Sequence, residues 1–132
     1  GSTPLAQYAA QTYASSGYGY ISDAEAFHPG DVVSMDYGHV WFVIGKYDDG
    51  SVLLAHNSTK GCQLSGTGGE ADKKARYYMA KYFPYWPYRP MTTSWYLGYM
   101  HKMTWNVGSF ISDPDGFMDM GPDEIMKVLL GD

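Results

Sequence analysis

The chain has 132 residues and a mass of 14.7 kDa, with 45% hydrophobic and 17% charged residues, a composition typical of one folded domain and not of a disordered chain. Nine Lys and Arg against 14 Asp and Glu give a net charge of -5, so the sequence lacks the basic surface that nucleic-acid binding requires. No apolar run approaches the roughly 20 residues of a membrane-spanning helix, and we therefore expect neither nucleic acid nor membrane insertion.

The first 28 residues predict little regular structure. Gly1 and Ser2 resemble the remnant of an expression tag. Residues 3–28 are rich in Ala, Tyr, Ser and Gly and predict a lead-in segment, with a weak helix over residues 5–13 and at most one further helical turn over residues 22–27. The domain proper is expected to span residues 29–132.

Four short runs rich in Val, Ile, Leu and aromatic residues predict an antiparallel meander. They occupy residues 31–35, 39–45, 51–56 and 62–65 and are separated by turn-forming residues. The second run does not alternate with polar residues over residues 40–44, so we expect this strand at the centre of the sheet with both faces covered.

The second half of the domain predicts helices. Apolar residues recur at helical spacing over residues 70–83, a loop rich in Pro and aromatic residues follows at 84–90, and residues 96–105 predict one more strand. A short terminal helix is predicted after Gly121, since Pro122 suits a first helical position. The fold class is therefore α+β, with a small antiparallel sheet curled into a partial barrel and flanking helices.

Two histidines are candidate functional residues. His39 opens the second strand and His56 closes the third, so the hairpin brings both to one end of the sheet. A four-residue loop over 46–49 sets them directly opposite each other on one face, whereas a three-residue loop over 48–50 sends them to opposite faces. Paired imidazoles suit general-base catalysis, because one can act as base while the other fixes its tautomer. Alternatively, each histidine is bonded to backbone and water.

Other chemistry has weaker support. A metal site could combine His39 and His56 with His101 or Asp36, but the short-range ligand spacing of a strong metal motif is missing. Cys62 is the only cysteine, and because it follows a turn and does not begin a helix, it predicts a small buried apolar residue and not a nucleophile. No cofactor is expected.

Three segments in order resemble a known family. Pro-Gly-Asp-Val-Val at residues 29–33, Gly-His-Val-Trp-Phe-Val-Ile-Gly at 38–45 and Ser-Val-Leu-Leu-Ala-His at 51–56 resemble the barrel half of the NlpC-type cell-wall cysteine peptidases, a papain-like group of secreted bacterial enzymes. A Ser-Gly-Thr at 65–67 and a Ser-Asp-Pro at 112–114 are similar to a Clostridia-type branch. The resemblance covers most of residues 29–132.

This resemblance implies an extracellular or cell-envelope hydrolase that cuts stem-peptide bonds of peptidoglycan. In the family, a Cys thiolate at a helix N-terminus attacks the carbonyl, a strand His is the base, and a polar residue on the next strand orients it. His39 matches the base and His56 the orienting residue, which favours the four-residue loop. Tyr37 and Trp86 are candidate substrate-binding residues, since aromatic residues in turns could reach a groove at the His39 end; alternatively, either is an ordinary packing residue.

The nucleophile of the family is missing. Nothing in residues 3–27 matches its Asp-Cys-Ser-Gly-like motif, so we expect the chain as given to be inactive as a peptidase. Either the nucleophile lies upstream in a longer parent protein, or the protein has lost it and binds cell-wall peptides beside Tyr37, His39 and Trp86, or a metal-dependent hydrolase uses the same histidines. Self-association is expected if a missing helix leaves an apolar face exposed.

Overall fold

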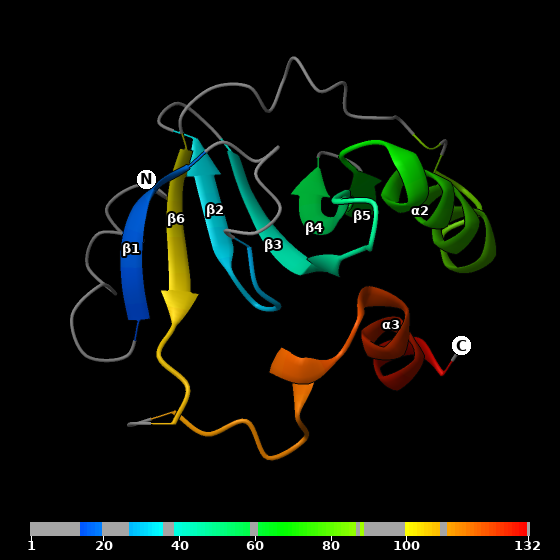
Figure 1. The fold of residues 1–132 in the computed structure, drawn as a ribbon. Helices are drawn as coiled ribbons and strands as arrows, with labels where there is room; N and C mark the ends of the chain where they lie inside the picture. Colours follow the sequence, from blue (N-terminus) through cyan, green and yellow to red (C-terminus); the bar gives the residue numbers. More distant parts are fainter. Residues whose placement is uncertain are drawn as a thin grey trace.

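A computed structural model describes residues 14–19, 27–35, 39–58, 61–86, 88, 100–108 and 111–131. In these ranges, two α-helices and a short 3-10 turn accompany one six-stranded sheet, whose strand order is β1-β6-β2-β3-β4-β5 with every neighbouring pair antiparallel (Figure 1). The strands are β1 (Ala14–Gly19), β2 (Val32–Met35), β3 (His39–Lys46), β4 (Val52–Ser58), β5 (Gly61–Gly66) and β6 (Met100–Trp105). The helical elements are α2 (Gly69–Tyr82), η3 (Phe117–Asp119) and α3 (Pro122–Leu130).

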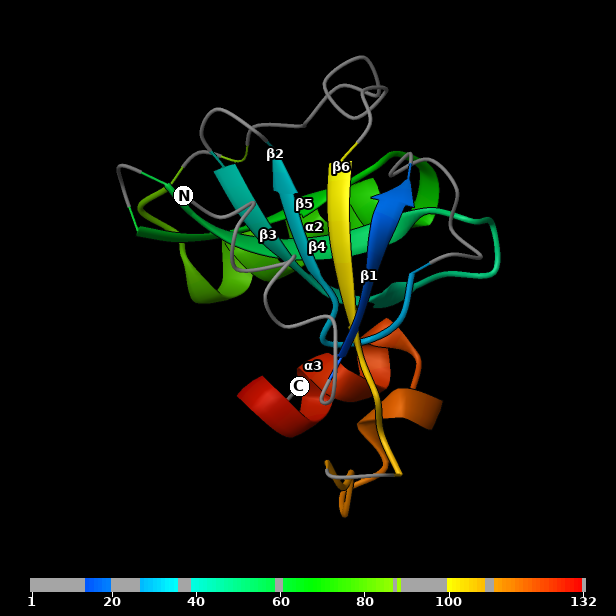
Figure 2. The ribbon, with the colours of Figure 1, turned by 90° about the vertical axis from the view of Figure 1, so that its left-hand side faces the viewer.

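The predicted α+β class is confirmed, and so are the meander strands and both helices of the second half. The sheet is open and strongly coiled, because β4 and β5 run nearly across the direction of β1 and β6 (Figure 2). β1 lies within the segment that the sequence predicted as a lead-in, and it forms a sheet edge by pairing along its whole length with β6. No helix in the described ranges is long and apolar enough to cross a membrane.

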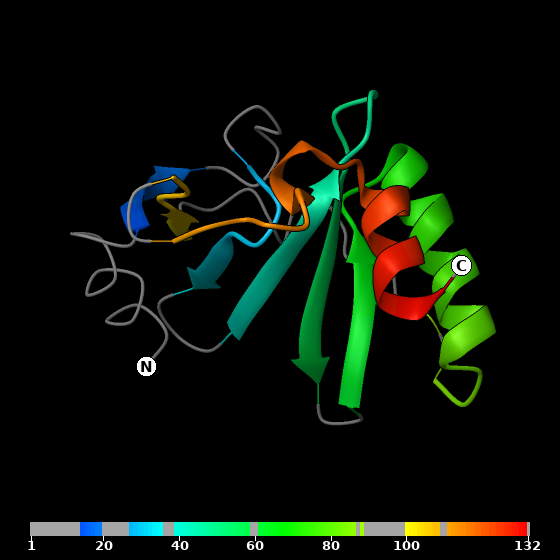
Figure 3. The same cartoon turned by 90° about the horizontal axis from the view of Figure 1, so that it is seen from below.

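Both helices pack against one face of β3, β4 and β5, which we name the helix face (Figure 3). The helical spacing predicted for residues 70–83 is confirmed, since Ala71, Ala75 and Tyr78 are buried in α2. The core of this face joins strand and helix residues, namely Ile44, Leu53, Leu64, Ala75, Tyr78, Met79, Ile125 and Met126. Burial of this apolar set is the main force that holds the helices on the sheet.

The first turn of α2 packs closely against the backbone at the end of β5. A Cβ atom at Gly66 would overlap the backbone of Ala71, so only glycine allows this approach. The end of β5 is therefore fixed against the start of α2.

Residues from the connection between β3 and β4, which is far from α2 in the sequence, cap the N-terminus of α2. Gly68 stands at the N-cap and has no side chain to offer, which leaves the first helical N–H groups in need of acceptors. The backbone N–H of Glu70 donates to Asp49 Oδ2 at 2.7 Å, and that of Ala71 donates to Ser51 Oγ at 2.9 Å. The hairpin and the helix are therefore held together by polar contacts as well as by the core.

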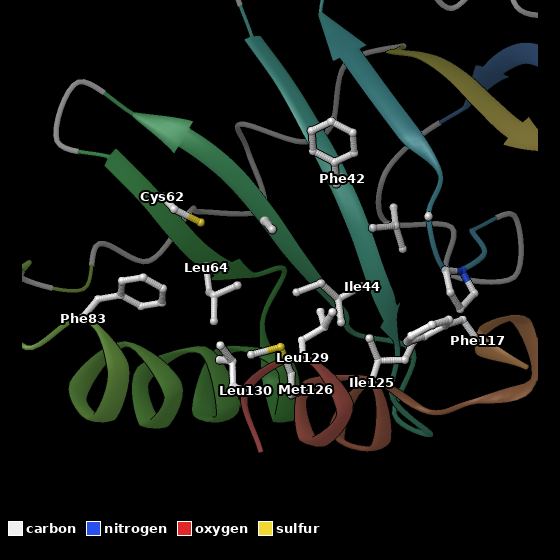
Figure 4. A pocket seen from close by; sticks show the side chains of 14 residues that line it. Phe42, Ile44, Cys62, Leu64, Phe83, Phe117, Ile125, Met126, Leu129 and Leu130 are labelled. Atoms are coloured by element: carbon white, nitrogen blue, oxygen red, sulfur yellow. The ribbon is translucent and has the colours of Figure 1, made fainter. Parts of the chain in front are cut away.

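One expectation about β3 is wrong. The strand was predicted to be covered on both faces, and Trp41 and Val43 are indeed buried on one of them. On the helix face, however, the side chain of Phe42 is 53% exposed. The reason is that α2 and α3 cover the part of the sheet near Ile44 and Leu64 and leave the surface beside Phe42 open (Figure 4).

Candidate functional site

The hairpin between β3 and β4 has the shorter of the two loops considered from the sequence. Tyr47 N donates to Ser51 O at 2.8 Å, which closes a three-residue loop over residues 48–50. Gly50 has a φ of 85°, the left-handed conformation that such a loop needs at its last position. The four-residue loop that the family resemblance favoured is therefore wrong.

A β-bulge nevertheless places His39 and His56 on the same face. Near the loop, Lys46 pairs with Val52 and Gly45 with Leu53, but Val43 pairs with Leu54, so Ile44 is an extra residue in β3. One extra residue exchanges the faces of all residues beyond it. If the register beside the loop continued along both strands without the bulge, His39 and His56 would lie on opposite faces of the sheet.

The two histidines are diagonal neighbours and not direct partners. The register Phe42↔Ala55, continued by one residue, sets Trp41 beside His56, with ring centroids 6.3 Å apart. His39 lies two residues before Trp41 and therefore on its face. We name the face of β3 to β5 that carries His39, Trp41 and His56 the histidine face.

The imidazole rings are in hydrogen-bond contact. His39 Nε2 lies 2.7 Å from His56 Nδ1, and the ring planes meet at 78°. The His39 ring also packs edge-on against Trp41, with centroids 4.7 Å apart. Trp41 is completely buried, so it gives the half-buried His39 ring a rigid support.

His56 is neutral near physiological pH. Burial, and secondly the nearby His39, lower the pKa of His56 from 6.5 to about 4. A neutral imidazole has one N–H donor and one acceptor nitrogen. His56 Nδ1 therefore either donates a hydrogen bond to His39 Nε2 or accepts one from it. Its second nitrogen, Nε2, lies 3.1 Å from Ser65 Oγ.

The remaining predicted site residues are not brought to the histidine pair by any described contact. Trp86 is half-buried and packs against the core of the helix face. Tyr37 and Asp36 lie outside the described residues, and so does the side chain of His101. A substrate-binding role for Tyr37 and Trp86 remains a prediction.

Cys62 lies on the face opposite the histidine pair. His56 pairs with Gln63, so the preceding residue of β5 points to the helix face, where Cys62 lines a pocket of about 510 Å³ together with Phe42 and Leu64 (Figure 4). The thiol is exposed, which corrects the expectation of a buried residue. Cys62 cannot donate its proton to His39 across the sheet, which supports the prediction that Cys62 is not the nucleophile.

A metal centre gains no support from the part of the chain that the structure describes. Within it, no group of three or more His, Cys, Asp or Glu residues is placed to hold a metal ion. The proposed third ligands, Asp36 and the side chain of His101, fall outside it.

Sequence reasoning missed Ser65 as a member of the site. Ser65 is 2% exposed and lies on β5 beside the pair formed by His56 and Gln63. Its role depends on the pairing of β4 with β5, which a single sequence does not specify. The only indication in the sequence was that alternate residues of a strand point to the same face, which places residues 63 and 65 on one face.

Comparison of the chain with models of protein families, with curated proteins and with solved structures found no match.

Proposed function

We propose that His39 and His56 form the base half of a cysteine peptidase site of the NlpC type, on a papain-like partial barrel, and that the substrates are peptidoglycan stem peptides. The observation that supports this proposal most directly is the 2.7 Å contact between His39 Nε2 and His56 Nδ1. A general base must have a fixed ring orientation and tautomer, and a neutral neighbour bonded to its second nitrogen supplies both.

The chemistry requires a thiol that this chain does not supply, since its only cysteine lies on the other face. His39 Nδ1 takes the proton of that thiol, and the thiolate attacks the peptide carbonyl carbon. His39 then gives the proton to the leaving amine, which breaks the C–N bond and leaves a thioester. Water hydrolyses the thioester, His39 accepts a proton from this water, and the thiol is restored.

The test uses the longest reading frame that contains this chain. We expect it to encode a Cys at the start of a predicted helix upstream of Thr3, and the expressed protein to release peptides from purified peptidoglycan fragments, as seen by mass spectrometry. The chain as given should release none. A reading frame with such a Cys that cleaves no stem peptide would contradict the proposal.

A second candidate is a relative without nucleophile that binds cell-wall peptides at the histidine face. It is favoured by the placement of the only thiol on the helix face. In that case stem peptides should shift the NMR signals of the His39 and His56 rings without being cleaved. Both candidates place the protein outside the cell or at the cell envelope, which fractionation of the source cells tests.

A further inference from the structure

The histidine pair continues into a third side chain on a third strand. From His39 on β3, contacts of 2.7 Å and 3.1 Å lead through His56 on β4 to Ser65 on β5. Each step is diagonal in the ladder, because His56 pairs with Gln63 and Leu54 pairs with Ser65. The three groups form one hydrogen-bonded row across the histidine face.

Ser65 is more deeply buried than either histidine, since it is 2% exposed and both histidines are partly exposed. Its side chain is buried, and the next residue, Gly66, is fixed against the first turn of α2. The backbone that follows Gly66 is also held by a hydrogen bond, since Thr67 N donates to Val52 O at 3.1 Å. A group on such a support can hold the ring of its neighbour in one orientation.

The direction of the hydrogen bonds along this row decides which nitrogen of His39 can act as base. If Ser65 Oγ accepts from His56 Nε2–H, then His56 Nδ1 accepts from His39 Nε2–H, and His39 Nδ1 is the acceptor nitrogen. If Ser65 donates, both histidines carry their proton on Nδ1, and His39 Nδ1 cannot take a proton from a thiol. A hydroxyl group permits both arrangements.

We infer that Ser65 is a positioning residue, which accepts the Nε2–H of His56 and thereby keeps the proton of His39 on Nε2. The placement of the three groups is independent of any reaction, while the choice of direction rests on the proposed function. Ser65 makes no contact with substrate in this account and acts only through His56.

Nitrogen-15 NMR of the histidine side chains tests this inference on the chain as given, at a pH above 6.5 where His56 is neutral. We expect His56 to show a protonated Nε2 and an unprotonated Nδ1, with well-separated signals. In Ser65→Ala the two signals should move toward each other as the tautomers mix. Ser65→Thr restores a hydroxyl and should restore the separation. Ser34→Ala is the matched control, because Ser34 is also completely buried but lies on β2.

A wild-type His56 protonated on Nδ1 would overturn the inference, and this result does not depend on whether the variants fold. Unchanged His56 signals in a folded Ser65→Ala variant would overturn it as well. The outcome is distinct from that for the proposed function. If the protein cleaves no stem peptide but His56 shows the expected tautomer, the peptidase function is refuted and the role of Ser65 stands. If the protein cleaves stem peptides but the His56 signals do not change in Ser65→Ala, the role of Ser65 is refuted and the peptidase function stands.

Discussion

His39 Nε2 lies 2.7 Å from His56 Nδ1 although the two residues are not opposite each other in the ladder between β3 and β4. The contact exists because Ile44 is an extra residue in β3 and brings the two rings to one face as diagonal neighbours. The bulge lies where α3 begins, since a Cβ at Gly45 would be 3.1 Å from Pro122. The start of the terminal helix therefore lies beside the irregularity of β3 that sets the geometry of the candidate site.

The first prediction concerns His39 as base. In a version of the protein that carries the nucleophile, His39→Ala should lower kcat/KM for stem-peptide cleavage by about three orders of magnitude or more, because loss of the base disables the whole catalytic unit. Circular dichroism should show an intact fold. His28→Ala is the control, since His28 is exposed and lies before β2. Undiminished turnover in His39→Ala would remove His39 from the mechanism.

The second prediction concerns the pH dependence of stability. Because the pKa of His56 is about 4 in the folded state and 6.5 ordinarily, the unfolded chain binds a proton between these values that the folded chain does not. The free energy of unfolding is therefore highest above pH 6.5, where His56 is neutral in both states, and it decreases as the pH falls toward 4. Solvent screening of a half-buried ring limits the loss to about 1–2 kcal/mol.

Urea unfolding of the wild type and of His56→Asn, at several values between pH 4.5 and 7.5, measures this effect. The variant should show a flatter dependence of its unfolding free energy on pH. Asp31, whose pKa is raised by burial, and Asp49, whose pKa is lowered mainly by its hydrogen bond from Ser51, contribute equally to both proteins and cancel. Identical slopes would show that folding does not lower the pKa of His56.

The third prediction concerns Cys62. Its thiol is exposed on the helix face, so iodoacetamide should modify it in the folded protein, as mass spectrometry would show. The ring signals of His39 and His56 should not move, because the modified sulfur lies on the other side of the sheet. Cys62→Ser should leave peptidase activity unchanged in a version with the nucleophile. If that substitution abolished cleavage, the assignment of faces would be wrong.

The fourth prediction concerns the remote cap of α2. Asp49→Ala removes the acceptor of the Glu70 N–H and should lower the free energy of unfolding by about 1 kcal/mol, the usual contribution of a helix cap. Asp48→Ala is the matched control in the same loop, since Asp48 is exposed and precedes the capping residue. Equal effects of the two substitutions would show that α2 does not depend on this contact.

The sequence predicted the elements of this fold better than their register. Runs of apolar residues predicted β2 to β5, and the helical spacing of Ala71, Ala75 and Tyr78 predicted α2. β1 was missed because its Ala, Ser and Gly residues carry no strand signal, and its existence depends on pairing with the distant β6. Such pairing is set by tertiary contacts.

The contact between His39 and His56 was expected from the sequence, but its geometry was not. His39 and His56 could be named because both lie at strand ends near one hairpin. The bulge at Ile44 adds one residue of β3 between the loop and the histidines, so neither loop length considered from the sequence gave the observed register at His39 and His56. Ser65 joins the site only through the pairing of β4 with β5.

We propose that His39, held by His56, is the base of a cysteine peptidase acting on stem peptides. The most direct test compares the protein expressed from the longest reading frame containing this chain with its His39→Ala variant on purified peptidoglycan fragments, with products identified by mass spectrometry. We expect the first protein to cleave a stem-peptide bond and the His39→Ala variant to cleave none, while His28→Ala remains active. Cleavage that persists without His39, or a protein with an upstream helix-start Cys that cleaves nothing, would contradict it.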